Sequence, residues 1–514
     1  MTPPLAALID LFELPFQRKV FRQTGWALAV GLLAATAFGQ TVTANFASRS
    51  GGGYYIPSRM FGINLVGLRD QTTVSQISQA GITESNTWGN ISGVYATSQP
   101  DWSQFDWQMK LAKSAGLHPL VTLAETPSWL QPSPNPCVAM GSPAPEAPPT
   151  NVSEWAKIAA SYVAHLDAAF PGLVQAYQIW NEPELQKSFC VSDNLDATRL
   201  STYLTLYAEA ASAMRAQAAR DGVTIEIGGP VISDLPLAKE WIPALLSDSS
   251  TYPNVDFISY HIYVTGSYEA GMDWNTLYAD TQSPTMGEAF YYLEQLGYVS
   301  KGLQPKPSAT PIYITEYNDN WLFAEDCCRN HPAYGPLWNS VAVVDFLNTV
   351  YGGAKHMPNK FFYFAGSATP YFCIAGQWNA TMNCDSSELE FYPQFYSYQL
   401  LASPAYLGLS QGGHMALSVS AANTRSGLLA TAFYNSTQDT IVVVNPTNTS
   451  YSSVTVVANN AGFSSAVGTL FILDQANPHI ARQSLVLAGS STGEFAATIA
   501  VPAYSTVAVT IAAK

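Results

Sequence analysis

The feature that most constrains this chain is an eightfold alternation of short apolar runs with amphipathic segments. The apolar runs are rich in β-branched and aromatic residues, which predicts strands, and the segments between them have helical periodicity. The predicted strands are Met60–Leu65, Ile82–Trp88, Leu117–Leu123, Val174–Trp180, Thr224–Gly229, Val255–Tyr260, Pro311–Thr315 and Lys360–Phe364. The most regular helical segments are Phe105–Ala115, Val152–Ala169, Thr198–Arg220 and Leu337–Val350. Eight strand–helix units predict an α/β fold, a closed parallel (β/α)8 TIM barrel over residues 55–400.

Helical periodicity ends near residue 405, and short strand-like runs separated by Asn, Gly, Ser and Pro follow. The clearest of these runs are Leu428–Phe433, Thr440–Val444, Ser453–Val457, Gly468–Leu473 and Ser505–Ile511. This pattern predicts a C-terminal β-sandwich over residues 405–514. Residues 40–54 are expected to form an N-terminal strand or linker, with Thr41–Ser48 as a candidate further strand of the sandwich.

The first 39 residues resemble an export signal. Three basic residues between positions 18 and 22 precede an apolar run from Trp26 to Ala37, and Ala35-Thr36-Ala37 has the small-x-small form of a cleavage site. A single membrane anchor is the alternative, but the apolar run is shorter than the roughly 20 residues that span a bilayer. We therefore expect a signal peptide over 1–39, a secreted or periplasmic protein, and no membrane association after cleavage.

The amino-acid composition limits the kinds of ligand that the chain is expected to bind. The chain carries 37 acidic and 22 basic side chains, for a formal charge of −15, and only 11% of its residues are charged. An acidic chain repels phosphate backbones, which excludes nucleic acid as the expected ligand. Neutral oligo- or polysaccharides remain compatible with this charge. Neither the charge nor the composition predicts an oligomeric state.

Two glutamates follow predicted strands directly. Glu182 lies in Ile179-Trp180-Asn181-Glu182-Pro183 at the end of the fourth strand, and Glu316 lies in Tyr313-Ile314-Thr315-Glu316-Tyr317-Asn318 at the end of the seventh. These strands face each other across the mouth of an eight-stranded barrel, where TIM-barrel enzymes have their active sites. Two carboxyls there are placed to flank one glycosidic bond. Retaining hydrolysis needs them roughly 5–5.5 Å apart, and inverting hydrolysis roughly 6.5–9.5 Å.

These motifs resemble clan A of the glycoside hydrolases and, within it, family 39, the β-xylosidase and iduronidase family. The likeness extends from about Gly81 to Asn320. Besides the two glutamate motifs it includes Thr126-Pro127-Ser128-Trp129-Leu130, Gly228-Gly229-Pro230 and Asp256-Phe257-Ile258-Ser259-Tyr260-His261.

The resemblance implies a role for each matching residue. Glu182 would be the general acid/base and Glu316 the nucleophile, with net retention. Asn181 would bind the sugar 2-hydroxyl, and His261 would contact the substrate or the nucleophile. No cofactor and no metal are implied.

The chain also departs from the clan. Clan members often carry an Arg near the end of strand two, and Glu84–Trp88 contains none. Many end strand eight with a Trp, where this chain has Tyr363-Phe364-Ala365-Gly366. The sugar specificity is therefore left open.

Further polar and aromatic residues are expected at the same face of the barrel. Glu125 ends strand three, where it either hydrogen-bonds a sugar hydroxyl or forms a structural ion pair. Tyr263 either positions the nucleophile or packs as a core aromatic. Trp129 and Trp321 are candidates for stacking on sugar rings, with a core role as the alternative for Trp129.

All six cysteines lie after the predicted signal, which favours disulfides. Cys137 and Cys190 fall in the loops after strands three and four, which are neighbours, so we predict a bond between them. Cys327 and Cys328 follow strand seven, and Cys373 and Cys384 follow strand eight. The remaining bonds are expected within this second group, with Cys373–Cys384 as one candidate.

The expected function is that of a secreted retaining glycosidase resembling β-xylosidases. An endo-glycanase of the cellulase or xylanase type is the alternative within the clan. A non-catalytic carbohydrate-binding surface protein is the alternative from another class, although such a protein has no need for two opposed carboxyls.

Overall fold

The computed structural model describes residues 40–65, 71–233, 235–263, 274–275, 278, 310–318, 334–352, 357–364, 377–378, 384–385, 391, 393–420, 427–489 and 493–514. Gln40–Lys514 form one compact unit. The predicted signal peptide, Trp321, Cys327, Cys328 and Cys373 lie outside the described residues, as does the side chain of Cys384.

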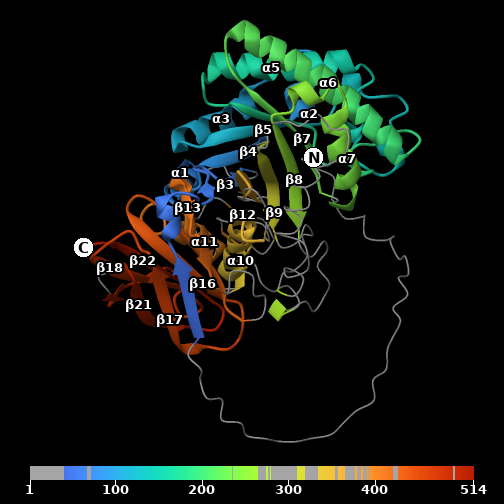
Figure 1. Cartoon of the computed structure of the whole chain (residues 1–514). Helices are drawn as coiled ribbons and strands as arrows, with labels where there is room; N and C mark the ends of the chain where they lie inside the picture. The colour runs from blue at the N-terminus through green and yellow to red at the C-terminus, as the bar shows by residue number, and fades with distance from the viewer. Residues whose placement is uncertain are drawn as a thin grey trace, which may run out of the picture. The chain divides into compact units, whose positions relative to one another are not determined.

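Eight parallel strands close into the predicted barrel, in the order β10-β3-β4-β5-β6-β7-β8-β9 (Figure 1). The strands are β3 (Phe61–Asn64), β4 (Glu84–Trp88), β5 (His118–Leu123), β6 (Ala176–Ile179), β7 (Glu226–Ile232), β8 (Phe257–Tyr263), β9 (Ile312–Asn318) and β10 (Lys360–Tyr363). Each corresponds to one strand predicted from the sequence, so the barrel prediction is confirmed.

Helices follow the barrel strands. The described ones are α1 (Gln71–Gln79), α2 (Ile91–Val94), α3 (Ser103–Ala115), α4 (Pro136–Ala139), α5 (Val152–Ala169), α6 (Asp196–Asp221), α7 (Leu235–Ser247), α10 (Tyr334–Asn348) and α11 (Pro393–Ala402). α5 and α6 pack against each other (Figure 1), and α6 also contacts β6. Among the described helices, none has the length and apolar character that a bilayer crossing requires.

The Pro-rich segment 131–150 is not entirely a loop. Prolines disfavour helix, yet Pro136–Ala139 form a single helical turn. The turn is possible because Pro136 occupies its first position, where proline loses no hydrogen bond. The Asn135 side chain caps it by accepting from the backbone N–H of Cys137 at 2.9 Å.

The barrel interior is layered. At its lower end Leu120, Ala176, Phe257, Tyr313 and Phe362 form a small apolar cluster. Every second residue of a strand points inward, so the next inward positions lie closer to the mouth. On β5 and β6 these positions are Thr122 and Gln178, and the Gln178 amide donates to the Thr122 hydroxyl at 2.7 Å. Apolar packing thus closes the bottom of the barrel, and a polar layer supports the mouth.

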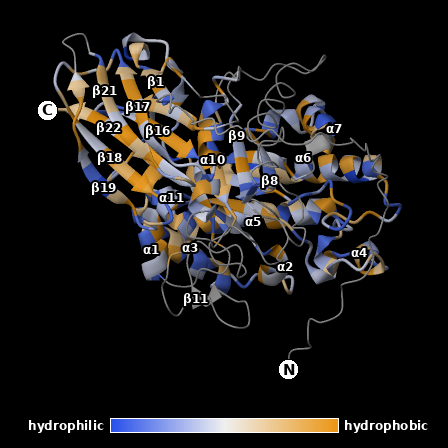
Figure 2. Ribbon diagram, turned by 90° about the horizontal axis from the view of Figure 1, so that it is seen from below, coloured by the Kyte–Doolittle hydropathy of each residue, from blue (hydrophilic) through white to orange (hydrophobic). Residues whose placement is uncertain are grey.

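Two sheets pack face to face as a sandwich after the barrel. The larger has the order β19-β18-β22-β16-β15-β13-β2, and the smaller β14-β1-β17-β21-β20. Figure 2 shows apolar residues along β16, β17 and β22, and Val42, Ile441, Val456 and Val509 belong to the shared core of the two sheets. The C-terminal sandwich is therefore confirmed.

The sandwich contains more strands than the sequence predicted. They are β1 (Gln40–Asn45), β2 (Tyr55–Ile56), β13 (Gly413–Met415), β14 (Ser418–Val419), β15 (Leu429–Tyr434), β16 (Gln438–Asn445), β17 (Tyr451–Asn459), β18 (Ala466–Leu473), β19 (Ala481–Leu485), β20 (Ala488–Gly489), β21 (Phe495–Val501) and β22 (Ser505–Ala513). β1 pairs in parallel with β17, so the N-terminal end of the described chain completes a sheet built from its C-terminal end.

Specific hydrogen bonds join the sandwich to the barrel helices. The Asn348 amide, at the end of α10, donates to the Ala430 carbonyl of β15 at 2.9 Å. The Tyr351 hydroxyl donates to the Ala416 carbonyl at 2.8 Å, and the Trp274 indole donates to the Pro446 carbonyl at 2.7 Å. The sandwich therefore braces the outside of the barrel through buried polar contacts as well as apolar packing.

Candidate active site

Glu182 is held at the barrel mouth by a strained backbone. β6 ends at Ile179, and Trp180 and Glu182 both adopt positive φ angles, 68° and 47°. The Trp180 N–H donates to the Leu123 carbonyl at 2.7 Å, and the Glu182 N–H donates to the Val231 carbonyl at 3.0 Å. Non-glycine residues with positive φ persist where the surrounding structure holds them, commonly at functional sites. Neighbouring strands on both sides therefore determine where the Glu182 carboxyl lies.

A β-bulge turns Glu316 into the barrel. In β9, Tyr313 packs in the interior cluster, so strict alternation would point Thr315 inward and Glu316 toward the surrounding helices. The β8–β9 register shifts instead, so that Tyr260 pairs with Ile314 and His261 with Glu316. Thr315 is the extra residue, and bulges re-aim side chains in this way. Glu316 therefore lies beside His261, and both are buried.

The polar layer fixes this bulge. The side-chain amides of Asn64 on β3 and Asn86 on β4 both donate to the Thr315 carbonyl, each at 3.2 Å. Asn86 in turn accepts from the Thr122 hydroxyl at 2.7 Å, which accepts from the Gln178 amide at 2.7 Å. Buried polar groups in such a network hold a unique geometry because each lost bond costs its desolvation. The network ties the backbone under Glu316 to four other strands or their ends.

Two carboxyls and an imidazole meet above this layer. His261 Nδ1 lies 2.8 Å from Glu182 Oε1 and 3.4 Å from Glu316 Oε2. The Tyr263 hydroxyl donates to Glu316 Oε2 at 2.5 Å. One oxygen of each carboxyl and the imidazole nitrogen all lie within 4.8 Å of one another. This separation is shorter than the roughly 6.5 Å that an inverting pair requires and close to that of a retaining pair.

The three groups influence one another's protonation. The pKa of Glu316 is raised to about 7, because burial and the Glu182 charge raise it by more than the charge of His261 and the Tyr263 hydrogen bond lower it. Burial would lower the pKa of His261, but the charge of Glu316 and the hydrogen bond to Glu182 outweigh it and raise that pKa. Proton uptake by any one of these groups therefore affects the others.

The same triad has the donor types of a metal site, since Glu182, His261 and Glu316 each offer one ligand atom. The hydrogen bonds to His261 and Tyr263 already satisfy these atoms, and acid–base and nucleophilic chemistry needs the same grouping of side chains. The arrangement therefore has a chemical explanation without an ion.

The remaining predicted residues lie around this centre. Asn181 is half-buried, and its Oδ1 atom has no hydrogen-bond partner within the described part of the chain. The Glu125 carboxylate accepts from the Ser92 hydroxyl, and no described cation pairs with it. Trp129 is 40% exposed, and its indole donates to the Tyr95 carbonyl at 3.0 Å. Glu125 is thus not part of a described ion pair, and Trp129 is not a core residue.

The predicted Cys137–Cys190 disulfide is present, with both cysteines buried. It joins the Pro-rich loop after β5 to the loop after β6. The Cys190 N–H also donates to the Glu146 carbonyl at 3.3 Å. Burial, with the charges of Glu125 and Glu182, raises the pKa of the Glu146 side chain to about 8. Glu146 was not predicted from the sequence because it lies in a Pro-rich loop without a motif.

Comparison with known proteins decides the family. Residues 102–348 match the profile of the family described as Glycosyl hydrolases family 39, and this span contains the carboxyl pair, His261 and Tyr263. The matched part of the chain belongs to glycosyl hydrolase family 39. The family 39 resemblance expected from the sequence is thereby confirmed, and this family 39 protein is a retaining glycosidase of clan A.

Solved structures share the whole fold of this family 39 glycosidase at low identity. The monomeric β-xylosidase from Caulobacter crescentus CB15 is 14% identical, with a TM-score of 0.62 over 92% of this chain and 99% of that chain. The family 39 enzyme from Xanthomonas axonopodis pv. citri is 14% identical, with a TM-score of 0.61 over 94% and 100%. The family 30 endoxylanase from Clostridium papyrosolvens C71 is 15% identical, with a TM-score of 0.59 over 92% and 100%. No curated protein sequence matches the chain.

Proposed function

We propose that this chain is a secreted β-xylosidase-like enzyme that cleaves neutral saccharides by double displacement, with Glu182 as acid/base and Glu316 as nucleophile. The observation that carries the proposal is the grouping of both carboxyls around His261 Nδ1, with oxygens within 4.8 Å. That spacing leaves no room for a water between sugar and carboxylate, which inversion requires.

The environments of the two carboxyls favour this assignment of roles. Glu316 accepts the Tyr263 hydrogen bond at 2.5 Å and faces the His261 imidazole. Both contacts favour its ionised form, which a nucleophile needs. The Glu182 side chain is 19% exposed, against 7% for Glu316. The greater exposure gives a leaving group and then a water access to Glu182.

The reaction then proceeds in two balanced steps. Glu316 attacks the anomeric carbon, the glycosidic bond breaks, and Glu182 gives its proton to the departing oxygen. Esterification removes the Glu316 charge, so Glu182, now ionised, takes a proton from water. The resulting hydroxide attacks the anomeric carbon and releases Glu316 as a carboxylate. His261 Nδ1 lies close to both carboxyls, at 2.8 Å and 3.4 Å, and helps to hold them together.

The sugar specificity is proposed on weaker grounds. Relatives of the same fold are described as β-xylosidases and as xylanases, so a β-xylose-containing substrate is the first to test. An endo-glycanase remains the second candidate, because the endoxylanase from Clostridium papyrosolvens C71 has the same architecture. The unpartnered Asn181 Oδ1 suits a sugar hydroxyl in either case.

Export is a separate proposal. The basic and apolar segments before residue 40 have the form of a signal peptide. The Cys137–Cys190 disulfide supports an oxidising compartment, because such bonds are rare in the cytosol. N-terminal sequencing of protein recovered from the culture medium or periplasm tests it, with a start near Gln40 as the expected result.

Activity on aryl β-glycosides of xylose, glucose, galactose and arabinose tests the catalytic proposal. We expect Glu182→Ala and Glu316→Ala each to lower kcat/KM by several orders of magnitude. Azide restores turnover of both, giving a glycosyl azide of inverted configuration with Glu316→Ala and of retained configuration with Glu182→Ala. A wild-type enzyme without glycosidase activity, or rescue with the two configurations exchanged, contradicts the assignment.

A further inference from the structure

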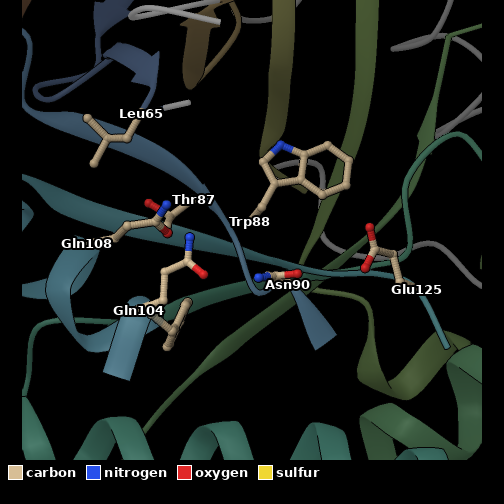
Figure 3. Close-up of a pocket in the computed structure, with 8 residues that line it drawn as sticks. Leu65, Thr87, Trp88, Asn90, Gln104, Gln108 and Glu125 are labelled. Carbon is tan, nitrogen blue, oxygen red and sulfur yellow. The ribbon is translucent and has the colours of Figure 1, made fainter. Parts of the chain in front are cut away.

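A cavity opens at the carboxyl ends of β4 and β5, and no member of the triad lines it. Its volume is about 240 Å³, slightly below the roughly 300 Å³ at which sites for drug-sized ligands begin. Figure 3 shows Asn90, Gln104, Gln108 and Glu125 around it, with the Trp88 ring on one side. Asn90 and Glu125 come from loops after β4 and β5, and the two glutamines come from α3. Four polar side chains from three segments thus converge on one space.

The polar groups of this cavity have unused hydrogen-bonding capacity. Gln104 is exposed and Asn90 and Gln108 are half-buried, and within the described part of the chain their side-chain amides make no hydrogen bond. Thr87, only 2% exposed, also lines the cavity, and its hydroxyl has no described partner. Buried polar groups are normally paired, so the unpaired Thr87 hydroxyl indicates a ligand or water in the functional state, and the three amides beside it are free to pair with the same ligand. These unpaired polar groups are therefore available to bind a ligand.

The local backbone supports the same interpretation. Asn90 and Glu125 adopt positive φ angles, 51° and 76°. These two residues and Trp180 and Glu182 thus form a series of strained positions around one side of the mouth. Such strain is tolerated where the surrounding structure over-determines it, and it is concentrated at ligand sites. The strain aims the Asn90 and Glu125 side chains at the cavity instead of along their strands.

The loops beside the cavity lead along the barrel rim to the group of Glu182, His261 and Glu316. Glu125 follows β5, whose neighbour β6 leads into Glu182. Pro145 and Ala147, on either side of Glu146, accept from the Thr126 N–H at 2.8 Å and the Thr126 hydroxyl at 2.6 Å. Glu146 thereby lies between the loops of Glu125 and Glu182. One side chain, Glu125, therefore belongs both to the cavity and to the group of carboxyls near the acid/base.

We propose that this cavity is a glycosyl-binding subsite, which holds a neutral sugar unit of an oligosaccharide next to the unit whose bond is cleaved. The proposal rests on the proposed function and adds the substrate class, a chain of at least two or three neutral sugars. Amides and a carboxylate pair with sugar hydroxyls as donors and acceptors. The apolar surfaces of Trp88 and Phe105 suit the C–H faces of a pyranose.

The charge of the cavity limits which other ligands it could bind. Glu125 is the one charged residue among the described residues that line the cavity. A carboxylate repels phosphate, sulfate and uronate groups, so acidic sugars and nucleotides are disfavoured. The subsite should therefore select neutral units over acidic ones.

The test compares substrate lengths in variants of α3. For the sugar that wild type cleaves best, kcat/KM is measured with the aryl monosaccharide and with the linear β-linked trisaccharide. The variants are Gln108→Leu and the double variant Gln104→Leu/Gln108→Leu. We expect the ratio of trisaccharide to monosaccharide kcat/KM to fall at least tenfold. Gln217→Leu on α6, outside the barrel, is the matched control and should keep the wild-type ratio.

Failure of this inference is distinguishable from failure of the proposed function. If the aryl monosaccharide is cleaved but the ratio is the same in wild type and both variants, the subsite is wrong and the function stands. If no glycoside is cleaved, the function is wrong. Calorimetry with xylotriose and cellotriose then decides the subsite: binding that weakens at least tenfold in Gln108→Leu supports it, and absent or unchanged binding overturns it.

Discussion

The Tyr263 hydroxyl donates to Glu316 Oε2 at 2.5 Å, from the same inward face of β8 that carries His261. This bond stabilises the ionised carboxylate and opposes the effect of burial on its pKa. A neighbouring strand therefore orients the proposed nucleophile, Glu316, and favours its ionised form.

Tyr263→Phe tests that bond through the pH profile. Without the hydroxyl, the pKa of Glu316 rises above about 7, and protonated Glu316 cannot attack. The acidic limb of kcat/KM should therefore move to higher pH, by about one unit if the bond contributes about 1.5 kcal/mol. Activity then falls more at pH 6 than at pH 8. Tyr260→Phe, on the same strand but without a described hydroxyl partner, should leave the profile in place, and an unshifted profile in Tyr263→Phe contradicts the account.

Much of this arrangement is predictable from the sequence. Eight apolar runs are sufficient for the barrel, because a buried parallel strand has a pattern of its own. The position of Glu182 and Glu316 after two such runs predicts their placement at the mouth. The Cys137–Cys190 bond follows from the neighbouring positions of two loops.

Other features depend on how the strands pair with one another, and the sequence alone does not predict this pairing. The Thr315 bulge is a register shift between β8 and β9, and alternation alone would point Glu316 outward. Gln104 and Gln108 have no sequence motif that distinguishes them from other polar residues of α3, and only the cavity that they line does so. Short strands such as β19 and β20 have little apolar alternation, since Ala481–Leu485 is mostly exposed.

Stability should depend on pH through Glu316. Its pKa of about 7 in the folded protein exceeds its ordinary value of 4.5, so the folded state binds the proton more tightly. Unfolding free energy therefore decreases as pH rises from about 4.5 to 7 and stays lower above pH 7. Glu316→Gln removes this loss and should be more stable than wild type at pH 8, by up to about 3 kcal/mol.

Urea unfolding at pH 5 and pH 8 measures this effect. The difference between Glu316→Gln and wild type should be large at pH 8 and small at pH 5. The exposed Glu240→Gln variant on α7 serves as the control and should show no such pH dependence. A variant that is equally or more strongly stabilised at pH 5 would show that Glu316 is not destabilising through its charge.

The acid role of Glu182 predicts a dependence on the leaving group. Glu182→Gln keeps the shape of the side chain but cannot donate a carboxyl proton. With poor leaving groups, kcat/KM should fall by about 10³, within the range of general acid catalysis. Dinitrophenyl glycosides need no proton, so their glycosylation rate should change much less. Equal losses across a series of phenols would argue against Glu182 as the acid.

Asn86 should act on Glu316 through the Thr315 carbonyl, which its amide reaches at 3.2 Å. Asn86→Ala frees that carbonyl, and a small shift of a reacting group can cost roughly 10²-fold in rate. We expect kcat to fall at least tenfold while KM changes little. Ser85→Ala, next to it on β4 and without a described hydroxyl partner, should retain the wild-type kcat. A loss confined to KM or to thermal stability would limit Asn86 to a structural role.

Covalent trapping tests the central claim most directly. An activated 2-deoxy-2-fluoro glycoside of the preferred sugar slows the second step more than the first, so the glycosyl-enzyme accumulates. Mass spectrometry of a proteolytic digest then locates the ester. The account predicts one added fluoroglycosyl group per chain, on the peptide that contains Glu316. An adduct on Glu182 or elsewhere, or turnover with an inverted product and no adduct, would contradict it.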